Sequence, residues 1–406
     1  MRITSRNNYL ETRRFAVQRI NRLPVKPLQR RKYETQSTAH MKKSKTRFIK
    51  QPPKEMIALL IAAHNEELVL GSTIRSAIFA GMNPKHIFVV DDNSSDKTTN
   101  VAKELLAAEN VIKVKRSGKG LALTKAARKF KLTKRYRWIH IADADGAFAT
   151  NYFHVFRSEL KEDFAAATGY VRSLPGKRVS EYRVFEYTMG MEIHRRMQTL
   201  LNVVPVIPGP TSCFRADVFD KVNFDNQSLT EDFDVTLQIH RKKLGKIQYI
   251  PKAVAYTQDP LTIKDFKKQI SRWNRGALQT MLQHKVGRHL TPIDAYLSYQ
   301  VLQNLFFFVI YCLWVPYLTI SRNTFGVIAT AFVVDVLITF VITVLTAIKS
   351  KRPDVVSAFP QVYILRWVSL YVFLKSFVEV IVLRKYRSGV SQWENNASRR
   401  YVMEVV

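Results

Sequence analysis

Two pairs of aspartates each end an apolar run of the sequence, and their carboxylates could bind a nucleotide and a metal ion. Asp91 and Asp92 end the first run, and Asp143 and Asp145 end the second. Carboxylates at the end of a strand can accept hydrogen bonds from a nucleobase or a ribose. Two carboxylates one residue apart can hold a hard divalent cation. The cation can also bind a diphosphate and offset the negative charge of the diphosphate as this group leaves. For the segment of the first pair the alternative is structural, because Asn93 and Ser94 can turn the chain and Asp96 can cap the helix expected to begin near Lys97.

A third acidic group, Thr230-Glu231-Asp232, lies where a helix is predicted to begin. A carboxylate at this place could act as a general base that takes a proton from an acceptor hydroxyl. The alternative is structural, because Thr230 can cap the helix and acidic residues favour the positive end of the helix dipole. The two roles are compatible.

Gln269, Arg272 and Trp273 form the fourth group, on a segment with helical spacing. Positions i, i+3 and i+4 share one side of a helix, so the three side chains could converge on a single ligand. Arginine suits a diphosphate and tryptophan suits stacking against a sugar ring. The alternative for Trp273 is an anchor at a membrane interface.

Short apolar runs alternate with helical patterns after residue 55, which predicts an α/β fold with a mostly parallel sheet and helices on both faces. In such sheets the loops at the carboxyl ends of the strands form the ligand crevice, and these loops hold the acidic groups. The expected strands are 57–63, 87–90, 111–114, 138–142, 247–250 and 253–257, and the expected helices are 151–160, 178–201 and 231–243.

The order and spacing of the four groups resemble the family 2 glycosyltransferases. The likeness is to membrane-integrated polysaccharide synthases, which include cellulose, hyaluronan and poly-N-acetylglucosamine synthases. It covers roughly residues 55–290. Three further segments support it, namely Ala62-Ala63-His64-Asn65-Glu66-Glu67, Gly118-Lys119-Gly120 and Gly209-Pro210-Thr211-Ser212-Cys213-Phe214-Arg215.

The resemblance implies a GT-A fold, a divalent cation (Mg²⁺ or Mn²⁺) and inversion of the anomeric centre in one displacement. It also implies a role for each matching residue. Asp91 or Asp92 and Asp143 would contact the nucleoside, Asp145 would bind the metal, and Asp232 would be the catalytic base. Gln269, Arg272 and Trp273 would hold the donor diphosphate and the acceptor end, and Lys119 and Glu66 are further candidates for donor binding.

The positive charge is concentrated at one end of the chain. The formal net charge is +32, and residues 1–54 contain 16 Lys or Arg against only Glu11 and Glu34. We expect this tail to be disordered and either merely solvated or attracted to anionic lipid headgroups, with each basic residue near the surface adding about 1 kcal/mol. Because the excess lies in the tail, nucleic acid is not an expected partner. The two cysteines, Cys213 and Cys312, predict no disulfide framework and fit a reducing compartment.

The chain divides into a catalytic part followed by a part with the pattern of a membrane protein. We expect a catalytic domain over 55–262, an amphipathic helix over 263–290 and a membrane domain over 291–388, followed by a tail over 389–406. The amphipathic helix suits a membrane surface, and an ordinary helix packed on the soluble core is the alternative. No segment before Pro53 has the length of a secretory signal, so the catalytic domain is expected in the cytoplasm.

Two apolar segments, 297–320 and 326–348, are each long enough to cross a hydrocarbon core that needs ~20 residues. Asp335 in the second is costly in lipid and should face a partner helix or a wet cavity. A third segment, 361–383, has the right length but contains Arg366, Lys375 and Glu379, so it either crosses or lies along the membrane. Its length and apolar content favour three spans.

Together these features predict a multi-pass protein of the cell membrane that transfers a sugar from a UDP-sugar, such as UDP-N-acetylglucosamine or UDP-glucose, to a growing polysaccharide. An accessory membrane subunit or a homo-oligomer is a further expected partner. The first alternative is a polyprenyl-phosphate sugar transferase, which has a lipid-linked acceptor and usually lacks the Gln-x-x-Arg-Trp element. The second alternative is a basic nucleic-acid-binding or membrane scaffold without activity.

Overall fold

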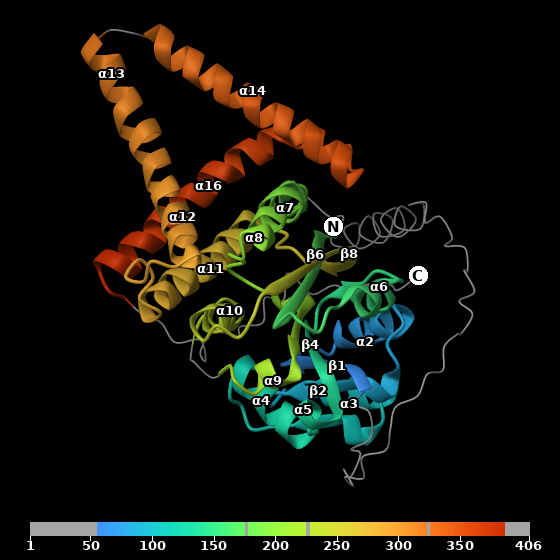
Figure 1. The fold of residues 1–406 in the computed structure, drawn as a ribbon. Helices are drawn as coiled ribbons and strands as arrows, with labels where there is room; N and C mark the ends of the chain where they lie inside the picture. The colour runs from blue at the N-terminus through green and yellow to red at the C-terminus, as the bar shows by residue number, and fades with distance from the viewer. Residues whose placement is uncertain (1–54, 175–177, 225–227, 323–324, 386–406) are drawn as a thin grey trace, which may run out of the picture. The chain divides into compact units, whose positions relative to one another are not determined.

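The structure, a computed structural model, describes residues 55–174, 178–224, 228–322 and 325–385 (Figure 1). The expected basic tail over 1–54 and the expected C-terminal tail over 389–406 lie outside these residues. The described chain begins with strand β1 (Glu55–Ala63) and ends with the helical segment η6 (Val378–Val382).

An eight-stranded sheet forms the centre of the first part of the chain, in the order β3-β2-β1-β4-β7-β6-β8-β5. β1 pairs in parallel with β2 and β4, β2 pairs in parallel with β3, and β6 pairs in parallel with β8. The other strands are β2 (Ile87–Asp91), β3 (Val111–Lys113), β4 (Tyr136–Asp143), β5 (Ala147–Phe148), β6 (Ala166–Ser173), β7 (Ser212–Arg215) and β8 (Ile247–Thr257).

The sheet is mixed, which corrects the expectation of a mostly parallel one. β7 is antiparallel to both β4 and β6, and β5 is antiparallel to β8. In an antiparallel pair, one strand ends at the edge of the sheet where the other begins. The segment between β6 and β7 therefore does not cross back over the sheet. That segment therefore returns to the carboxyl ends of β4 and β6, where the predicted ligand crevice lies.

The first four expected strands are confirmed, and their ends differ from the prediction by no more than two residues. The two strands expected over 247–257 are one strand, β8, whose register against β6 shifts after Ile250. β5, β6 and β7 were not predicted. β6 begins with the small residues Ala166 and Ala167, and β5 and β7 have only two and four residues, so none of them carries a strong strand signal.

The two faces of β1 lie in two hydrophobic cores, as alternation along a strand requires. Ile57, Leu59 and Ile61 belong to one core, and Ala58 and Leu60 belong to the other. The first core contains residues of α2 (Leu70–Phe79), α3 (Thr98–Leu105) and α6 (Tyr152–Glu159). The second contains residues of α4 (Lys119–Lys129), α5 (Leu132–Arg135), α9 (Ala216–Phe219) and α10 (Glu231–Arg241).

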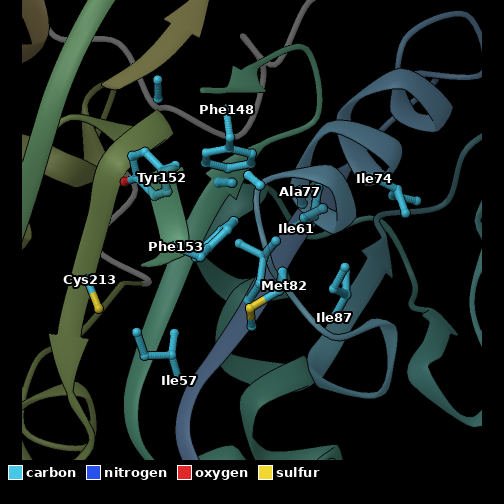
Figure 2. Close-up of a cluster of buried hydrophobic side chains, with 14 of the residues drawn as sticks. Ile57, Ile61, Ile74, Ala77, Met82, Ile87, Phe148, Tyr152, Phe153 and Cys213 are labelled. Carbon is cyan, nitrogen blue, oxygen red and sulfur yellow. The ribbon is translucent and has the colours of Figure 1, made fainter. Parts of the chain in front are cut away.

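Large aromatic side chains fill the first core, shown in Figure 2. Phe148 and Phe153 lie with ring centres 4.9 Å apart, and both belong to the same core as Ile61 of β1. His140 of β4 is fully buried among these rings, and its Nε2 lies 2.8 Å from the hydroxyl oxygen of Tyr152. Burial lowers the pKa of His140 to about 3, so this histidine is a neutral core residue.

A second part of the chain is helical. The expected helix over 178–201 is a continuous helical segment made of α7 (Arg178–Met189), the π-helical η3 (Gly190–His194) and α8 (Arg195–Leu200). α11 (Ile263–Gln283) follows the sheet. The remaining helices are α12 (Pro292–Phe308), η5 (Val309–Trp314), α13 (Val315–Arg322), α14 (Phe325–Ser350), α15 (Asp354–Ser357) and α16 (Phe359–Phe377).

The apolar face of α11 packs on protein. Phe266 and Ile270 are buried in one cluster with Val362 and Leu365 of α16. The face that the sequence suggested for a membrane surface or for the soluble core thus lies against another long helix. The placement of α11 near a bilayer stays a prediction.

By length and composition, two helices of the described chain could cross a membrane, Pro292–Ser321 and Ile328–Ser350. They match the two segments expected from the sequence. The third expected span, 361–383, is not among them; it contains Arg366, Lys375 and Glu379. Asp335 of α14 does face a partner helix, because its carboxylate accepts hydrogen bonds from the Arg366 guanidinium at 2.5 Å and from the Tyr363 hydroxyl at 2.8 Å.

Gly120 in the first turn of α4 provides a test of this packing. A Cβ atom there would lie 1.9 Å from the carbonyl oxygen of Phe224, which is backbone and cannot rotate away. We expect Gly120→Ala to lower the free energy of unfolding by about 1–3 kcal/mol, measured by thermal or denaturant unfolding. Gly190→Ala is the control, since a Cβ there meets nothing within 4 Å. Equal stability of the two variants would contradict the close approach of α4 to Phe224.

Candidate active site

Lys119 lies at the centre of the candidate site, at the first position of α4. Its Nζ atom is 2.7 Å from Oδ1 of Asp143 and 2.7 Å from Oε1 of Glu231. Burial lowers the pKa of Lys119, but the two carboxylates raise it by more, so the side chain remains a cation. The ammonium thus joins the end of β4 to the start of α10.

The loop before Lys119 is held by the fully buried carboxylate of Asp92. Its Oδ1 accepts a hydrogen bond from the backbone N–H of Ser117, and its Oδ2 accepts one from that of Gly118, both at 2.8 Å. Gly118 has φ +87, a conformation that side chains with a Cβ rarely adopt. The visible role of Asp92 is therefore to place the start of α4.

Asp91 holds the loop between β2 and α3. Its Oδ1 accepts from the backbone N–H of Ser94 at 2.7 Å, and its Oδ2 accepts from the Thr99 hydroxyl. The neighbouring loop after β1 joins the same region, because the backbone N–H of Glu66 donates to the Thr98 hydroxyl at 2.7 Å. Contacts of Asp91, Asp92 and Glu66 with a nucleotide stay predictions.

Asp143 ends β4, and Asp145 follows in a turn that α2 supports. The single hydroxyl of Thr73 on α2 lies 2.7 Å from the carbonyl oxygen of Ala144 and 2.8 Å from that of Gly146. The side chains of Asp143 and Asp145 are both partly exposed. Thr73 was not singled out in the sequence, where a threonine inside a helix carries no signal of such a contact.

The residues present fit a divalent cation that the donor helps to bind. Among the described residues no group of three or more His, Cys, Asp or Glu could hold a metal alone. Mg²⁺ and Mn²⁺ in phosphate-transfer sites are bound by one or two carboxylates, with substrate oxygens completing the shell. Asp145, with Asp143 two residues before it, offers this oxygen-only set at the open end of β4.

Gly209 closes the site on the side of β7. A Cβ atom at this position would lie 2.8 Å from Oδ2 of Asp143 and 3.1 Å from Nζ of Lys119. A side chain there would push the Asp143 carboxylate out of its present position beside Lys119. This close approach gives a physical reason for the glycine in the segment 209–215, which supported the family resemblance.

Glu231 and Asp232 begin α10 and have opposite electrostatic environments. Burial raises the pKa of Glu231, but the nearby Lys119 lowers it by more, so this carboxylate is ionised. Burial and then the negative charge of Glu231 raise the pKa of Asp232 to about 6. A carboxylate with a pKa near the working pH is suited to act as a general base. Thr230 occupies the cap position of α10 without a capping hydrogen bond from its side chain.

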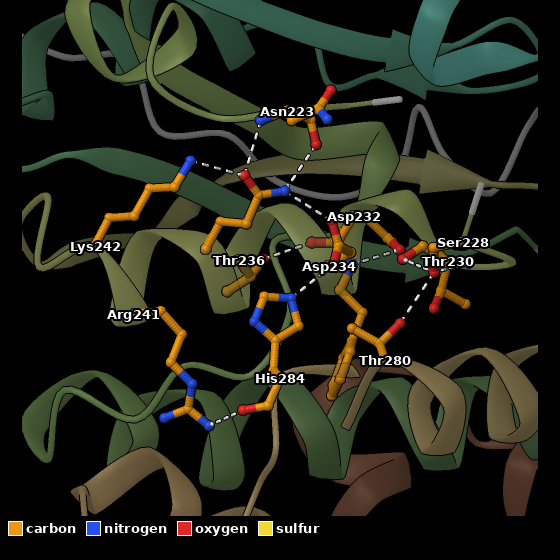
Figure 3. Close-up of polar contacts among 12 residues, drawn as sticks. Asn223, Ser228, Thr230, Asp232, Asp234, Thr236, Arg241, Lys242, Thr280 and His284 are labelled. Atoms are coloured by element: carbon orange, nitrogen blue, oxygen red, sulfur yellow. Dashed lines mark hydrogen bonds and ion pairs between the residues drawn. The ribbon is translucent and has the colours of Figure 1, made fainter. Parts of the chain in front are cut away.

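Figure 3 shows how α10 is held against α11. The Asp234 carboxylate lies 2.7 Å from Nε2 of His284, and the hydroxyls of Ser228 and Thr280 lie 3.0 Å apart. Gly276 of α11 allows this approach, because a Cβ there would lie 2.6 Å from the side chain of Thr230. The start of α10, which carries Asp232, is thereby held against α11.

The three motif residues of α11 point to two different neighbours. Arg272 donates from Nη1 to the carbonyl oxygen of Leu229 at 3.1 Å, three residues before Asp232. Gln269 and Trp273 instead contact Arg183 of α7, whose Nη2 donates to Oε1 of Gln269 at 2.5 Å. The sequence did not indicate Arg183, since an arginine in an amphipathic helix is normally expected on the solvent side.

The structure thus brings Lys119, Asp143, Glu231, Asp232 and Arg272 to one region. A single chain of contacts runs from the end of β4 through Lys119 to the start of α10 and on to α11. Asp91 and Asp92 support this region through the loops before α3 and α4.

The fold is that of the GT-A glycosyltransferases. The solved structure of the mannosyltransferase PcManGT from Pyrobaculum calidifontis, in complex with GDP-Man and Mn2+, aligns with a TM-score of 0.50 at 12% identity, over 83% of this chain and 92% of that one. At that identity the likeness concerns the fold alone.

The family model described as "Glycosyltransferase like family 2" matches residues 52–276, more than half of the chain. The chain belongs to this family. It is 26% identical over 240 residues to the poly-beta-1,6-N-acetyl-D-glucosamine synthase of Staphylococcus aureus (strain COL), and 25% identical over 246 residues to the probable glycosyltransferase YdaM of Bacillus subtilis (strain 168). The matched regions cover 56% and 58% of each chain, so the likeness spans little more than half the length of these relatives.

Replacement of Lys119 by methionine tests the central ion pairs. Without the ammonium, Asp143 and Glu231 lose their shared partner, and we expect a loss of stability on the order of 2 kcal/mol at pH 7. Because Lys119 lowers the pKa of Glu231, its contribution is present above the unfolded-state pKa of about 4.3 and is lost as pH falls. The deficit of Lys119→Met, measured by denaturant unfolding, should therefore stay constant from pH 7 to about pH 4.3 and narrow below it, as pH falls through the lowered pKa of Glu231.

Lys221→Met is the matched control, since the Lys221 side chain is 58% exposed and its ion pair with Asp217 spans 3.5 Å. We expect a change below about 0.5 kcal/mol for this variant. A Lys119→Met deficit that stayed the same at all pH values would argue against the ion pairs as its cause.

Proposed function

We propose that the protein is an inverting glycosyltransferase that moves a sugar from a UDP-sugar to a growing polysaccharide at the cytoplasmic face of the cell membrane. The observation that carries this proposal is the cluster formed by Lys119, Asp143, Glu231, Asp232 and Arg272 at one edge of the sheet. Acidic and basic groups alternate there around one carboxylate with a raised pKa. Such a set can bind a charged diphosphate and still accept a proton.

Asp232 would act as the base in this reaction. It takes the proton of an acceptor hydroxyl as that oxygen forms a bond to the anomeric carbon of the donor. The bond between this carbon and the phosphate oxygen breaks on the opposite side, and the nucleoside diphosphate leaves with the electron pair. One displacement of this kind inverts the anomeric centre.

The neighbouring charges would hold the donor. Asp143 is assigned to the nucleoside and Asp145 to the cation, and a bound Mg²⁺ or Mn²⁺ supplies positive charge to the leaving diphosphate. Lys119, which remains a cation, is placed between Asp143 and Glu231, where it can also attract phosphate oxygens. Arg272 adds a second cation near the same point, and Gln269 and Trp273 complete the assigned binding set.

An amino sugar is the favoured donor group. The Staphylococcus aureus relative is named as a synthase of poly-beta-1,6-N-acetyl-D-glucosamine, which supports UDP-N-acetylglucosamine ahead of UDP-glucose. The acceptor would be the end of the polysaccharide, and a lipid-linked sugar acceptor is the alternative that the same site could serve.

The membrane assignment is supported by the two long apolar helices and by how their ends are held. Lys349 at the end of α14 lies 3.6 Å from Glu192, and Tyr296 near the start of α12 accepts from Gln198 at 2.7 Å. Both partners belong to the segment η3–α8. A helix pair that starts and ends at the same segment fits two crossings that return the chain to the catalytic side.

The side chains of these helices fit a lipid environment with a paired charge inside. Asp335 meets Arg366 and Thr339 also contacts Arg366, so the costly charges are satisfied between helices. Many large apolar side chains of the two helices are exposed, including Leu302, Phe306, Leu313, Trp314, Ile320, Phe332, Leu337, Ile338, Val341, Leu345 and Ile348.

The direct test incubates membranes that contain the protein with Mg²⁺ or Mn²⁺ and a panel of UDP- and GDP-sugars. Release of UDP from UDP-N-acetylglucosamine is expected, with a product cut by linkage-specific hydrolases. Asp232→Asn should lower the rate about 10²–10⁴-fold while UDP binding persists, because the amide cannot accept the proton. Asp145→Asn should raise the concentration of Mg²⁺ or Mn²⁺ that half-maximal UDP release requires and should lower the rate of release. Normal turnover of Asp232→Asn would exclude its role as the base.

The pH profile gives a second test, because Asp232 must be ionised to accept a proton. With its pKa raised to about 6, kcat/KM should fall about tenfold per pH unit below that value and level off above it. Glu231 raises the pKa of Asp232 and Lys119 lowers it, so Glu231→Gln should move the acid limb to lower pH and Lys119→Met to higher pH. An acid limb that neither variant moves would assign it to another group.

A further inference from the structure

Arg183 of α7 is a buried arginine that contacts the motif helix α11 directly (both helices are labelled in Figure 1). Its side chain is 0% exposed. Nη2 donates to Oε1 of Gln269 at 2.5 Å, and the guanidinium carbon lies 4.8 Å from the ring centre of Trp273 and 4.7 Å from that of Phe266. Nη1 donates to the Glu186 carboxylate. One cation thus contacts two of the three motif residues.

The contact with Gln269 sets the orientation of the amide. Arginine has only N–H donors, so the atom of Gln269 that faces Arg183 must be the oxygen. The NH₂ group is then directed away from Arg183, with its two N–H donors available to a phosphate oxygen. Without this partner the buried amide could rotate by half a turn and present its oxygen, which would repel a phosphate.

The contact with Trp273 leaves one face of the ring for a ligand. A guanidinium over an indole face is attracted by about 0.5–2 kcal/mol, depending on how far it is removed from water. Arg183 lies on the side of α7, and Trp273 itself is only partly buried. A sugar that stacks on Trp273 must therefore use the face or edge that Arg183 does not cover.

Arg183 is not needed to hold the two helices together. Val179 and Tyr182 of α7 already share an apolar cluster with Phe266 and Ile270 of α11. A buried ion pair adds little stability over an apolar residue of similar size, and the Nε atom of Arg183 makes no hydrogen bond within the described part of the chain. The charge therefore calls for a reason other than packing.

We propose that Arg183 is a positioning residue that orients the Gln269 amide toward the donor diphosphate and fixes the Trp273 ring for the acceptor. It does so without touching either substrate. This inference rests on the proposed function, which assigns Gln269 and Trp273 to substrate binding. It adds a residue of α7, outside the recognised motifs, to the parts that transfer requires.

A double-mutant cycle tests the inference with UDP-N-acetylglucosamine and Mn²⁺. Arg183→Met alone should lower kcat/KM at least tenfold. In a Gln269→Ala or a Trp273→Ala background the same change should have a clearly smaller effect, because the residue through which it acts is already lost. An undiminished effect of Arg183→Met in both backgrounds would overturn the proposal.

Arg195→Met is the matched control. Arg195 lies on α8 of the same helical segment, is 5% exposed and donates to the carbonyl oxygen of Val206 at 2.7 Å. Whatever effect Arg195→Met has on kcat/KM in the wild type, the effect should be equally large in the Gln269→Ala and Trp273→Ala backgrounds. Arg183→Lys, which keeps the charge but not the planar fork, should fall between wild type and Arg183→Met, and it carries the same cycle if the methionine variant does not fold.

Tryptophan emission tests the geometry without turnover. The Trp273 signal is the difference between a protein and the same protein with Trp273→Phe. This difference spectrum should change in Arg183→Met and be nearly retained in Arg183→Lys and Arg195→Met. An unchanged difference spectrum in Arg183→Met would refute the contact between Arg183 and Trp273. A wild-type protein that releases no nucleotide from any donor would instead refute the proposed function, and the evidence from emission for the contact would still hold.

Discussion

The ammonium of Lys119 between Asp143 and Glu231 is the interaction on which the site depends. Asp143 ends the parallel half of the sheet, and Glu231 starts a helix that comes almost a hundred residues later. Without Lys119 the two carboxylates would repel each other. The ammonium between them is attracted to both and so holds the two elements together. Its charge also separates the two acidic residues of α10. Lys119 keeps Glu231 ionised, while burial and the negative charge of Glu231 raise the pKa of Asp232 by more than Lys119 lowers it.

The supporting residues act mainly by placing backbone. Asp92 accepts from Ser117 and Gly118 and so sets where α4 begins, which in turn sets the position of Lys119. Gly209 and Gly276 work in the opposite sense, by leaving out a side chain where Asp143 and Thr230 need the space. Buried acids and close glycines are thus two means to the same end, a short distance between charged groups from separate elements.

The segment α7–η3–α8 links the site to the long helices. Arg183 on it contacts Gln269 and Trp273, whereas Glu192 and Gln198 further along contact the ends of α14 and α12. α11 is likewise packed between this segment and α16 through Phe266 and Ile270. The motif residues of α11 are therefore held by the same elements that hold the apolar helices, which gives a physical reason for the two parts to occur in one chain.

Sequence patterns were enough to predict the strands that precede Asp91 and Asp143, the two long apolar helices and the family. The alternation of apolar and helical segments, their lengths and the order of the motifs can all be read along the chain. It did not reveal the antiparallel β7, the packing of α11 on α16, or Arg183. Strand direction depends on which edge a connection returns to, and burial of an arginine depends on a partner that is distant in sequence. The roles of Asp145, Asp232 and Arg272 were proposed from their order. Which charges lie within reach of one another became clear from the fold alone, because it depends on where separate elements bring their ends together.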